Sequence, residues 1–549
     1  MLTNNSPMDN INNTYQPIVG KNLIEILMFS MYSDSLIIFR EYVQNAFDAI
    51  VEAKRQGVLS NIKEGQVSIT IDPVSRKIHI LDNGVGINVS QAQPILLNIA
   101  DSHKDGIGLA GQYGIGRLVG AKYCKRLIFK TSAKGENRYT EITFDNELAQ
   151  KIISNKEDKS TATQVIDRIT SVDVGEEAPD KHYFEVRMEE VSEHHRNLLN
   201  VGKVSEYLKE VAPIDYMLEF KNMLYNQCLP IQYHNFNEEL DHIRLTVNDE
   251  IDIRKRYGLM IDGTGDKISS LQFFKFEDSE FGLLGWGWYA ITPFTKAIPA
   301  LDVNKGIRLR KRNIQVGSKD LLNQYFREAR GNNYFYGEIH AIHPNLKPNS
   351  SRDGLTHTPE AIRLYEYIKD YFSDLQKLYH LANDAKNLYR DIHLSGTSAP
   401  QSDEEKVKIQ TKISTTIEQF DKIKTKYKDD DNIGEASDKV LAIYDKTIKK
   451  TLESLPTDIL PSNVTSLTDI GDKTNGETIS IVTPTPAPIQ EEPTPSAVTD
   501  IFAPLNKKCT PEEIKLIRKV FAILSQNCPI SQRTMFETMK EKAIKQLSK

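Results

Sequence analysis

The apolar residues between positions 39 and 50 recur at helical spacing. In this stretch, FREYVQNAFDAI, the residues Phe39, Val43 and Phe47 fall on one side of a helix with about 3.6 residues per turn. A stripe of this kind predicts a helix that buries one side against a sheet. The polar residues of the same stretch then lie on another face.

That polar face carries two carboxylates and an amide, from Glu41, Asn45 and Asp48. Glu41 is suited to activate a water molecule as a general base, and the Asn45 amide oxygen is suited to join phosphates and waters around Mg²⁺. The same residues also fit an ordinary solvated helix surface. The motifs further along the chain favour the hydrolytic alternative.

A β-hairpin is predicted after this helix. Residues 67–72 (VSITID) and 77–82 (KIHILD) alternate in polarity around a short turn. The second strand ends in Asp82, whose carboxylate can accept a hydrogen bond from an exocyclic amine such as that of adenine. Gly84 and Gly86 follow, and they let the backbone turn sharply and approach a ligand closely.

A glycine-rich segment occupies residues 108–122 (GLAGQYGIGRLVGAK) and runs into an apolar stretch that we expect to be helical. Backbone amides in such a loop and at the start of a helix bind phosphate groups. The glycine pattern alone is common in tight turns, and the Walker pattern is absent. The order and spacing of helix, hairpin and loop together indicate an ATP site.

These motifs resemble those of the GHKL ATPases. This Bergerat-fold group includes the ninety-kilodalton heat-shock chaperones, MutL-type mismatch-repair proteins, type II topoisomerase ATPase subunits, microrchidia proteins and histidine kinases. The chaperone branch is the most similar. Its R-E-L-x-x-N-x-x-D-A corresponds to residues 40–49, its I-A-x-S to residues 99–102, and its G-Q-F-G-V-G to residues 111–116.

The resemblance implies ATP and Mg²⁺ as ligands and gives each site residue a role. Glu41 would be the general base, Asn45 the Mg²⁺ ligand, and Asp82 the residue that recognises adenine. The other nucleotide-binding residues would be Asp48, Gly84, Gly86, Ser102, Lys104, Gly111, Gln112, Tyr113, Gly114, Ile115, Gly116 and Thr163.

The chain departs from the chaperone pattern at three places. Asp101 stands where the family has a basic residue before the lid serine, so Lys104 or another element would supply the cation that faces the phosphate. Only a short stretch separates Ser102 from the phosphate loop, so the lid is expected to close differently. The G-T pair of the family corresponds to Ala162-Thr163, which keeps a hydroxyl for adenine and loses the glycine.

The resemblance continues into the middle domain of the chaperones. Residues 305–317 (KGIRLRKRNIQVG) resemble its G-x-x-L-x-x-x-R strand, and residues 336–355 (YGEIHAIHPNLKPNSSRDGL) resemble the segment that ends in L-P-L-N-x-S-R-E. On this match Arg352 is the arginine that swings to the γ-phosphate. A guanidinium suits that role because it stays charged and offers planar, paired donors. A surface turn at Arg352-Asp353 is the alternative.

Arg308, Arg310 and Arg312 occupy alternate positions, so a strand over this segment places all three on one face. Such a face is suited to follow a nucleic-acid backbone, to lie in solvent, or to take part in coupling to ATP. The sequence leaves these alternatives open.

Helices are predicted beyond residue 355. Residues 357–384 contain no glycine and a single proline, Pro359. An apolar stripe at near-heptad spacing then suits either pairing between subunits or packing within the domain. It comprises Ile409, Ile413, Ile417, Phe420 and Tyr427.

The end of the chain has the composition of a linker followed by a small module. Between residues 455 and 504, prolines are interspersed with threonines, serines and acids. A capping box begins at Thr510, with Pro511 at the first helical position, and an apolar stripe follows. A module as small as residues 505–549 has little core of its own, so we expect it to associate with a partner or a second copy.

Composition limits the remaining possibilities. The chain has 549 residues, of which 39% are hydrophobic, and a net charge of −6, so several domains are expected and no overall attraction to nucleic acid. We find no signal-peptide pattern and no apolar run near the roughly 20 residues of a membrane span. A cytoplasmic protein away from the membrane is expected. The four cysteines lack metal-binding spacing, so we expect reduced thiols and no metal besides Mg²⁺.

We therefore predict an α+β protein whose function is an ATP-dependent conformational switch of the heat-shock-chaperone type. It would act as a homodimer on a protein client or partner. The alternative is a DNA- or RNA-engaging clamp of the microrchidia or MutL kind in bacterial repair or phage defence; a histidine kinase is disfavoured because no phosphoacceptor helix precedes the nucleotide domain. The predicted parts are a Bergerat-fold nucleotide domain (1–180), a transducer-like α/β middle domain (181–355), a helical region (356–454), a linker (455–504) and a helical tail module (505–549).

Overall fold

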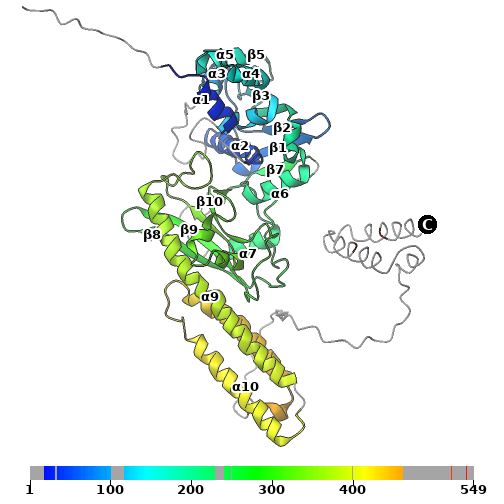
Figure 1. Cartoon of the computed structure of the whole chain (residues 1–549), viewed down its shortest axis with the longest axis vertical. Coiled ribbons are helices and arrows are strands. Elements are labelled where there is room, and N and C mark those ends of the chain that lie inside the picture. Colours follow the sequence, from blue (N-terminus) through cyan, green and yellow to red (C-terminus); the bar gives the residue numbers. More distant parts are fainter. Residues whose placement is uncertain are drawn as a thin grey trace, which may run out of the picture. The chain divides into compact units, whose positions relative to one another are not determined.

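The computed structural model (Figure 1) describes residues 18–30, 34–99, 116–228, 240–248, 250, 252–397, 400–461, 521 and 540. The chain separates into two units, Met1–Val482 and Thr483–Lys549, and every element named below belongs to the first. Of the second unit only Phe521 and Lys540 are described, each in a helical conformation. The predicted tail module and most of the predicted linker therefore lie outside the described residues.

A seven-stranded sheet forms the first region, in the order β5-β4-β3-β6-β2-β1-β7. Neighbouring strands are antiparallel except β1 and β7, which are parallel. The predicted hairpin is confirmed, because β1 and β2 pair from Asp72 and Lys77 at the turn to Val67 and Asp82. The strands are β1 (Gln66–Asp72), β2 (Lys77–Asp82), β3 (Cys124–Ser132), β4 (Arg138–Asp145), β5 (Thr170–Glu176), β6 (Tyr183–Val191) and β7 (Arg244–Val247).

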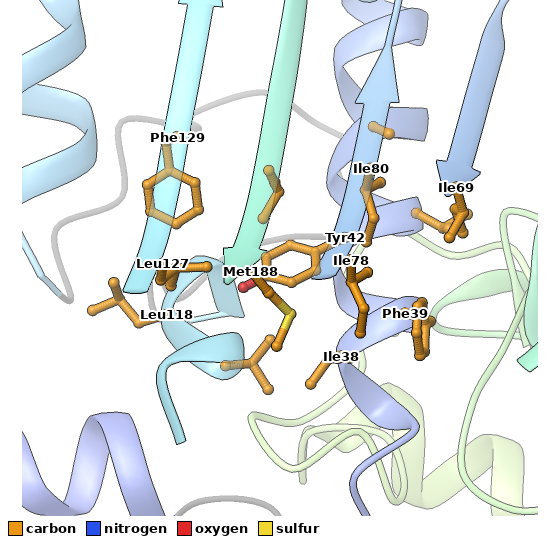
Figure 2. Packing of buried hydrophobic residues seen from close by; sticks show 14 of the residues in the cluster. Ile38, Phe39, Tyr42, Ile69, Ile78, Ile80, Leu118, Leu127, Phe129 and Met188 are labelled. Atoms are coloured by element: carbon orange, nitrogen blue, oxygen red, sulfur yellow. The ribbon is translucent and has the colours of Figure 1, made fainter. Parts of the chain in front are cut away.

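Helix α2 (Ile37–Arg55) packs on this sheet as the apolar pattern predicts. Phe39, Val43 and Phe47 are all buried, and each such side chain contributes about 1.5–3 kcal/mol through the area it removes from water. Figure 2 shows side chains of this core from α2, η3 (Gly116–Tyr123) and four strands: Ile38, Phe39, Tyr42, Ile69, Ile78, Ile80, Leu118, Leu127, Phe129 and Met188. The shorter helices are α1 (Asn22–Glu25), η1 (Ile26–Ser30), η2 (Ile62–Glu64), α3 (Val89–Leu97), α4 (Asn146–Ser154), α5 (Ala162–Ile169) and η4 (Glu193–Leu199).

The first region extends beyond the predicted boundary at residue 180. That boundary falls in the polar loop between β5 and β6, yet β6 lies between β3 and β2 in the middle of the sheet. Helix α6 (Val201–Val211) packs on α2, and Leu245 and Ile253 belong to the same core. Because β6 is hydrogen-bonded between two earlier strands, the domain cannot end before it.

A second, five-stranded sheet has the order β11-β10-β12-β9-β8. Strands β10 and β12 are parallel and the other neighbours antiparallel. The mixed α+β class is confirmed. The strands are β8 (Ser270–Asp278), β9 (Gly282–Ile291), β10 (Gly306–Lys311), β11 (Ile314–Gln315) and β12 (Tyr336–Ala341), with helices α7 (Leu218–Cys228), η6 (Leu321–Tyr325) and η7 (Ala329–Tyr334).

The arginines of β10 are in the interior, which corrects two of the three alternatives for this strand. Arg308 and Arg310 are 2% and 1% exposed, and Arg312 lies in the turn that follows. Arg310 Nε lies 2.6 Å from Glu338 Oε1 of β12, and its Nη2 donates to the Glu210 carbonyl oxygen of α6 at 3.1 Å. The β10 arginines therefore form neither a solvated face nor a surface for a nucleic-acid backbone.

Three long helices follow the second sheet, namely α9 (Pro359–Thr397), α10 (Asp403–Lys424) and α11 (Gly434–Glu453). Ile413 and Phe420 of α10 are buried in a core shared with α9 and α11, and Ile409, Ile417 and Tyr427 pack against it. The stripe thus packs within its own domain, which confirms that alternative. The first part of the predicted linker continues this region, because Ile459 of η8 (Thr457–Ile459) is buried.

Among the described residues, no helix has the length and apolar character needed to cross a bilayer. Within the same residues, no group of three or more His, Cys, Asp or Glu side chains is arranged to hold a metal ion. Cys124 is a free, buried thiol, and the side chains of the other three cysteines lie outside the described set.

Candidate nucleotide site

Helix α2 carries the predicted polar residues, but they do not form a solvated surface. Glu41 and Asp48 are each 2% exposed, and Asn45 is half-buried. Helical spacing brings these residues to one side of α2, and the rest of the domain covers them. A buried carboxylate is costly unless it is paired or hydrogen-bonded, so the partner of Glu41 is informative.

The partner of Glu41 is Arg352, which follows β12 and is 311 positions away in the chain. Arg352 Nε lies 3.0 Å from Glu41 Oε1, and Arg352 Nη2 donates to Oε2 at 3.4 Å. Arg352 is only 8% exposed, so the surface-turn alternative for this residue is wrong. The two side chains predicted to act in catalysis are therefore brought together as a buried ion pair.

The last glycine of the phosphate-loop motif lies against Glu41. A Cβ atom at Gly116 would be 2.6 Å from Glu41 Oε2, so a larger residue at this position would displace the Glu41 carboxylate. Tyr42 holds the same segment: its hydroxyl donates to the Arg117 carbonyl oxygen and accepts from the Gly120 N–H, both at 3.0 Å. The other predicted residues of the loop and lid lie outside the described residues: Ser102, Lys104, Gly111, Gln112, Tyr113, Gly114 and Ile115.

Tyr42 is a site residue that the sequence reasoning missed. It follows Glu41 and reads as one more apolar position of α2, although its hydroxyl joins α2 to the end of the glycine loop. Burial raises the pKa of Tyr42, so the hydroxyl stays neutral and serves as both donor and acceptor. The available sign of this contact in the sequence was Gly120, a further glycine that follows the loop motif.

Asp82 lies at the end of β2 and is 5% exposed. Its Oδ1 accepts a hydrogen bond from the Gly84 N–H at 2.8 Å. Burial outweighs this bond and raises the pKa of the Asp82 carboxyl to about 7. The carboxyl is therefore poised to gain from a polar donor that enters the site, and the 6-amino group of adenine is such a donor.

Two backbone contacts fix the loop that follows Asp82. The Val85 N–H donates to the Ala49 carbonyl oxygen of α2 at 3.1 Å, and His182 Nδ1 donates to the Gly84 carbonyl oxygen at 2.8 Å. A Cβ atom at Gly84 would be 2.6 Å from the Ala49 Cβ. The loop thus rests directly on α2, which brings Asp82 and the Glu41 helix into one site.

Gly86 is the most constrained glycine of this loop. Its φ is +68°, a conformation that L side chains rarely adopt, and an added Cβ would lie 1.9 Å from the Ser132 carbonyl oxygen of β3. The clash is with backbone, which cannot move as a flexible side chain can. The glycine predicted from the sequence is therefore required here.

Replacing Gly86 by alanine should lower the melting temperature of the nucleotide domain strongly, by an amount equivalent to about 2–4 kcal/mol, because strain and clash add. Gly57→Ala is the matched control, since Gly57 has a similar φ of +72° with open space around it. Its expected cost is only about 1 kcal/mol. Calorimetry of both variants measures the difference; equal losses would contradict the close packing assigned to Gly86.

Thr163 is the predicted residue that the structure does not bring to Asp82. It lies exposed in the first turn of α5, which is capped by Thr161 and leads into the edge strand β5. Strands β4, β3 and β6 separate β5 from β2. The position beside Asp82 belongs to Phe184 of β6, which also pairs with Thr131 of β3.

Thr131 of β3 carries a hydroxyl and lies in register with Asp82 through Phe184 of β6. It accepts from the Ile87 N–H and donates to the Tyr183 carbonyl oxygen, both at 2.9 Å, and Thr131 is fully buried. The alternation of residues 183–191 was the available sequence signal for a strand here, and its place next to β2 comes from the structure.

Comparison with known proteins agrees with this geometry. Residues 34–176 match the family model described as histidine kinase-, DNA gyrase B- and HSP90-like ATPase. The chain therefore carries a GHKL-type ATPase domain. Among curated proteins it is similar to chaperone protein HtpG of Fusobacterium nucleatum subsp. nucleatum, with 24% identity over 252 residues, which are 42% of this chain and 41% of the relative.

Two further relatives carry the same printed name. HtpG of Halalkalibacterium halodurans is 24% identical over 271 residues, covering 44% of this chain and 40% of the relative. HtpG of Roseobacter denitrificans is 29% identical over 141 residues, covering 23% and 22%. The chain thus spans less than half the length of each of these relatives.

Proposed function

We propose that this protein hydrolyses ATP in a Mg²⁺-dependent manner and uses the cycle as a conformational switch of the HSP90-like chaperone type. The observation that carries the proposal is the pairing of Glu41, inside the matched ATPase domain, with Arg352 from the second sheet region. A buried carboxylate and an arginine contributed by different parts of a chain suit a reaction that depends on the arrangement of those parts.

The residues around the site suit an adenine nucleotide. Asp82 offers a buried carboxyl to the adenine amine, while Gly84 and Gly86 keep the adjoining backbone close. Asn45 would ligate Mg²⁺, which neutralises phosphate charge when bound. Asp48 and the glycines that end at Gly116 complete the proposed site.

In the proposed reaction Glu41 accepts a proton from the water that attacks the γ-phosphorus, and Arg352 stabilises the charge on the phosphoryl oxygens. In the structure these two side chains engage each other. Arg352 must therefore move from the Glu41 carboxylate towards the phosphate before Glu41 can accept the proton. We infer that the paired arrangement is the resting state of the switch.

We further propose that the switch works as a homodimer on a protein client or partner, with the segment 505–549 as a contact. The printed name of the relatives supports the chaperone role. The alternative of a nucleic-acid clamp is weakened, because Arg308 and Arg310, two of the arginines that suggested it, are buried among carboxylates.

A parallel assay separates these two roles. The chain at equimolar ratio to a thermally unfolded model protein should suppress light scattering in the presence of ATP, and duplex DNA should leave its ATP turnover unchanged. Turnover that rises with DNA and loses this stimulation as salt is added would overturn the chaperone role in favour of the clamp.

Nucleotide affinity should depend on pH through Asp82. The ionised carboxylate is the better acceptor for the adenine amine, and its pKa of about 7 means that protons compete with the nucleotide below that value. ATP binding is thus expected to tighten from about pH 6 to about pH 8, by no more than tenfold per unit. Calorimetric titration at several pH values measures the affinity for ATP, and Asp82→Asn should remove most of its dependence on pH. An unchanged pH dependence in that variant would show that a group other than Asp82 causes it.

A further inference from the structure

An ion pair followed by a chain of hydrogen bonds connects the end of α6 to the backbone of Arg352. Arg308 Nη1 lies 3.2 Å from Glu210 Oε1 and donates to Gln315 Oε1 at 3.0 Å. Gln315 Nε2 donates to the Gly317 carbonyl oxygen at 3.2 Å. The Gly317 N–H in turn donates to the Arg352 carbonyl oxygen at 2.9 Å.

Packing alone does not account for these polar residues. Arg308 and Gln315 are 2% and 3% exposed, in strands β10 and β11. Apolar residues of similar volume would fill such positions without the cost of taking a guanidinium and an amide out of water. Buried polar groups that are joined in a network instead select one arrangement of the surrounding backbone.

The far end of the network holds Arg352 in an unusual conformation. The φ of Arg352 is +60°, which non-glycine residues seldom adopt unless neighbouring contacts impose it. Gly317 makes the approach possible, because a Cβ there would be 2.9 Å from the Asp353 carbonyl oxygen. The backbone of Gly317 thus packs directly against the turn that carries Arg352, which lets its N–H reach the Arg352 carbonyl oxygen.

The near end of the network lies on the other half of the site. Glu210 is at the end of α6, and α6 packs on α2, the helix of Glu41. Burial raises the pKa of Tyr207 of α6, and the charges of Arg40, which lowers it, and Glu41, which raises it, also act on this hydroxyl. A movement of α6 relative to β10 would therefore change the hydrogen bonds that lead to Arg352.

We propose that Arg308 and Gln315 are positioning residues for Arg352, and that through them the placement of α6 on α2 sets where the Arg352 guanidinium points. This inference rests on the proposed ATPase function. Neither residue touches the reacting atoms, and their effect is transmitted through the backbone of Gly317 and Arg352.

The test compares Gln315→Met with Gln272→Met in the full chain. Gln272 is the matched control because it is 7% exposed, lies in β8 at the opposite edge of the same sheet, and donates to Glu435 Oε2 at 3.0 Å. Q315M should lower kcat by roughly 10- to 100-fold, as displacement of a catalytic group does, with ATP affinity within about threefold of wild type. Q272M should leave kcat unchanged.

Two readouts separate positioning from general damage. In an Arg352→Ala background, Q315M should cause no further loss of kcat, since the guanidinium that Gln315 is proposed to position is already absent. Deuterium exchange of a peptide covering residues 345–356 should rise in Q315M and not in Q272M. If Q315M folds poorly, Gln315→Glu, which keeps the acceptor for Arg308 and loses the donor to Gly317, replaces it and should raise exchange at the same peptide.

The outcomes also distinguish this inference from the proposed function. If the wild type hydrolyses ATP and Arg352→Ala is impaired while Q315M is not, the positioning role is overturned and the ATPase proposal stands. A loss of kcat that is equally large with and without Arg352 overturns it as well. If the wild type does not hydrolyse ATP, the exchange comparison still decides whether Gln315 orders the Arg352 turn, and equal exchange in both variants overturns that role.

Discussion

Replacement of Glu41 by glutamine is expected to reduce ATP turnover by roughly 10²- to 10⁴-fold, the usual contribution of a positioned general base. Glutamine has nearly the same shape and can still accept a hydrogen bond from Arg352, but it cannot take a proton from water. ATP affinity should stay within about threefold of wild type, because Asp82 and the glycine loops are untouched. Single-turnover cleavage and equilibrium binding, measured on the same preparation, separate the two quantities.

Glu52→Gln is the control for this variant. Glu52 lies on the same helix, three turns closer to its end, and pairs with Arg55 near the surface. Its neutralisation should leave turnover unchanged. If turnover falls by a similar factor in both variants, the effect belongs to α2 as a whole, and Glu41 has no special role.

Arg352→Ala is expected to lower kcat by roughly 10- to 10³-fold, as removal of one donor to a developing charge does. ATP affinity should change little, since the guanidinium contacts Glu41 in the structure. Arg352→Lys should recover only part of the rate, because an ammonium lacks the planar pair of donors. Phosphate release at saturating ATP measures kcat for the wild type and both variants.

Arg363→Ala provides the comparison for Arg352→Ala. Arg363 lies in α9, has a side chain that is 47% exposed, and makes ion pairs with Asp278 and Glu366. Its loss should leave kcat unaffected. If Arg352→Ala behaves like Arg363→Ala, the arginine is structural and the coupling between the two sheet regions must use other residues.

The sequence was most informative where a pattern and a backbone requirement coincide. The α2 stripe and the β1–β2 hairpin follow from periodicity, which depends on neighbouring residues alone, and the strand at 306–311 was expected from the resemblance. Gly86 could be predicted because a sharp turn beside a strand demands it, and the structure shows the clash that any larger residue would meet.

Features that depend on distant pairing could not be derived in this way. Alternation placed Arg308 and Arg310 on one face, but their burial follows from Glu210 and Glu338, which other elements supply. Thr163 was assigned to the site because it fits a short motif. The strand that pairs with β2 beside Asp82 is β6, whereas Thr163 precedes the edge strand β5. Tyr42 could not be told from the apolar residues of α2, because its hydroxyl finds its hydrogen-bond partner only when η3 packs against α2.

Phosphate release from ATP and Mg²⁺ by the wild-type chain and by Glu41→Ala, each with and without duplex DNA and at matched nucleotide occupancy, tests the central claim most directly. The account predicts turnover by the wild type that DNA does not change, and a loss of at least roughly 100-fold in the variant. Equal turnover by the two proteins would show that Glu41 is not the base of a hydrolytic site.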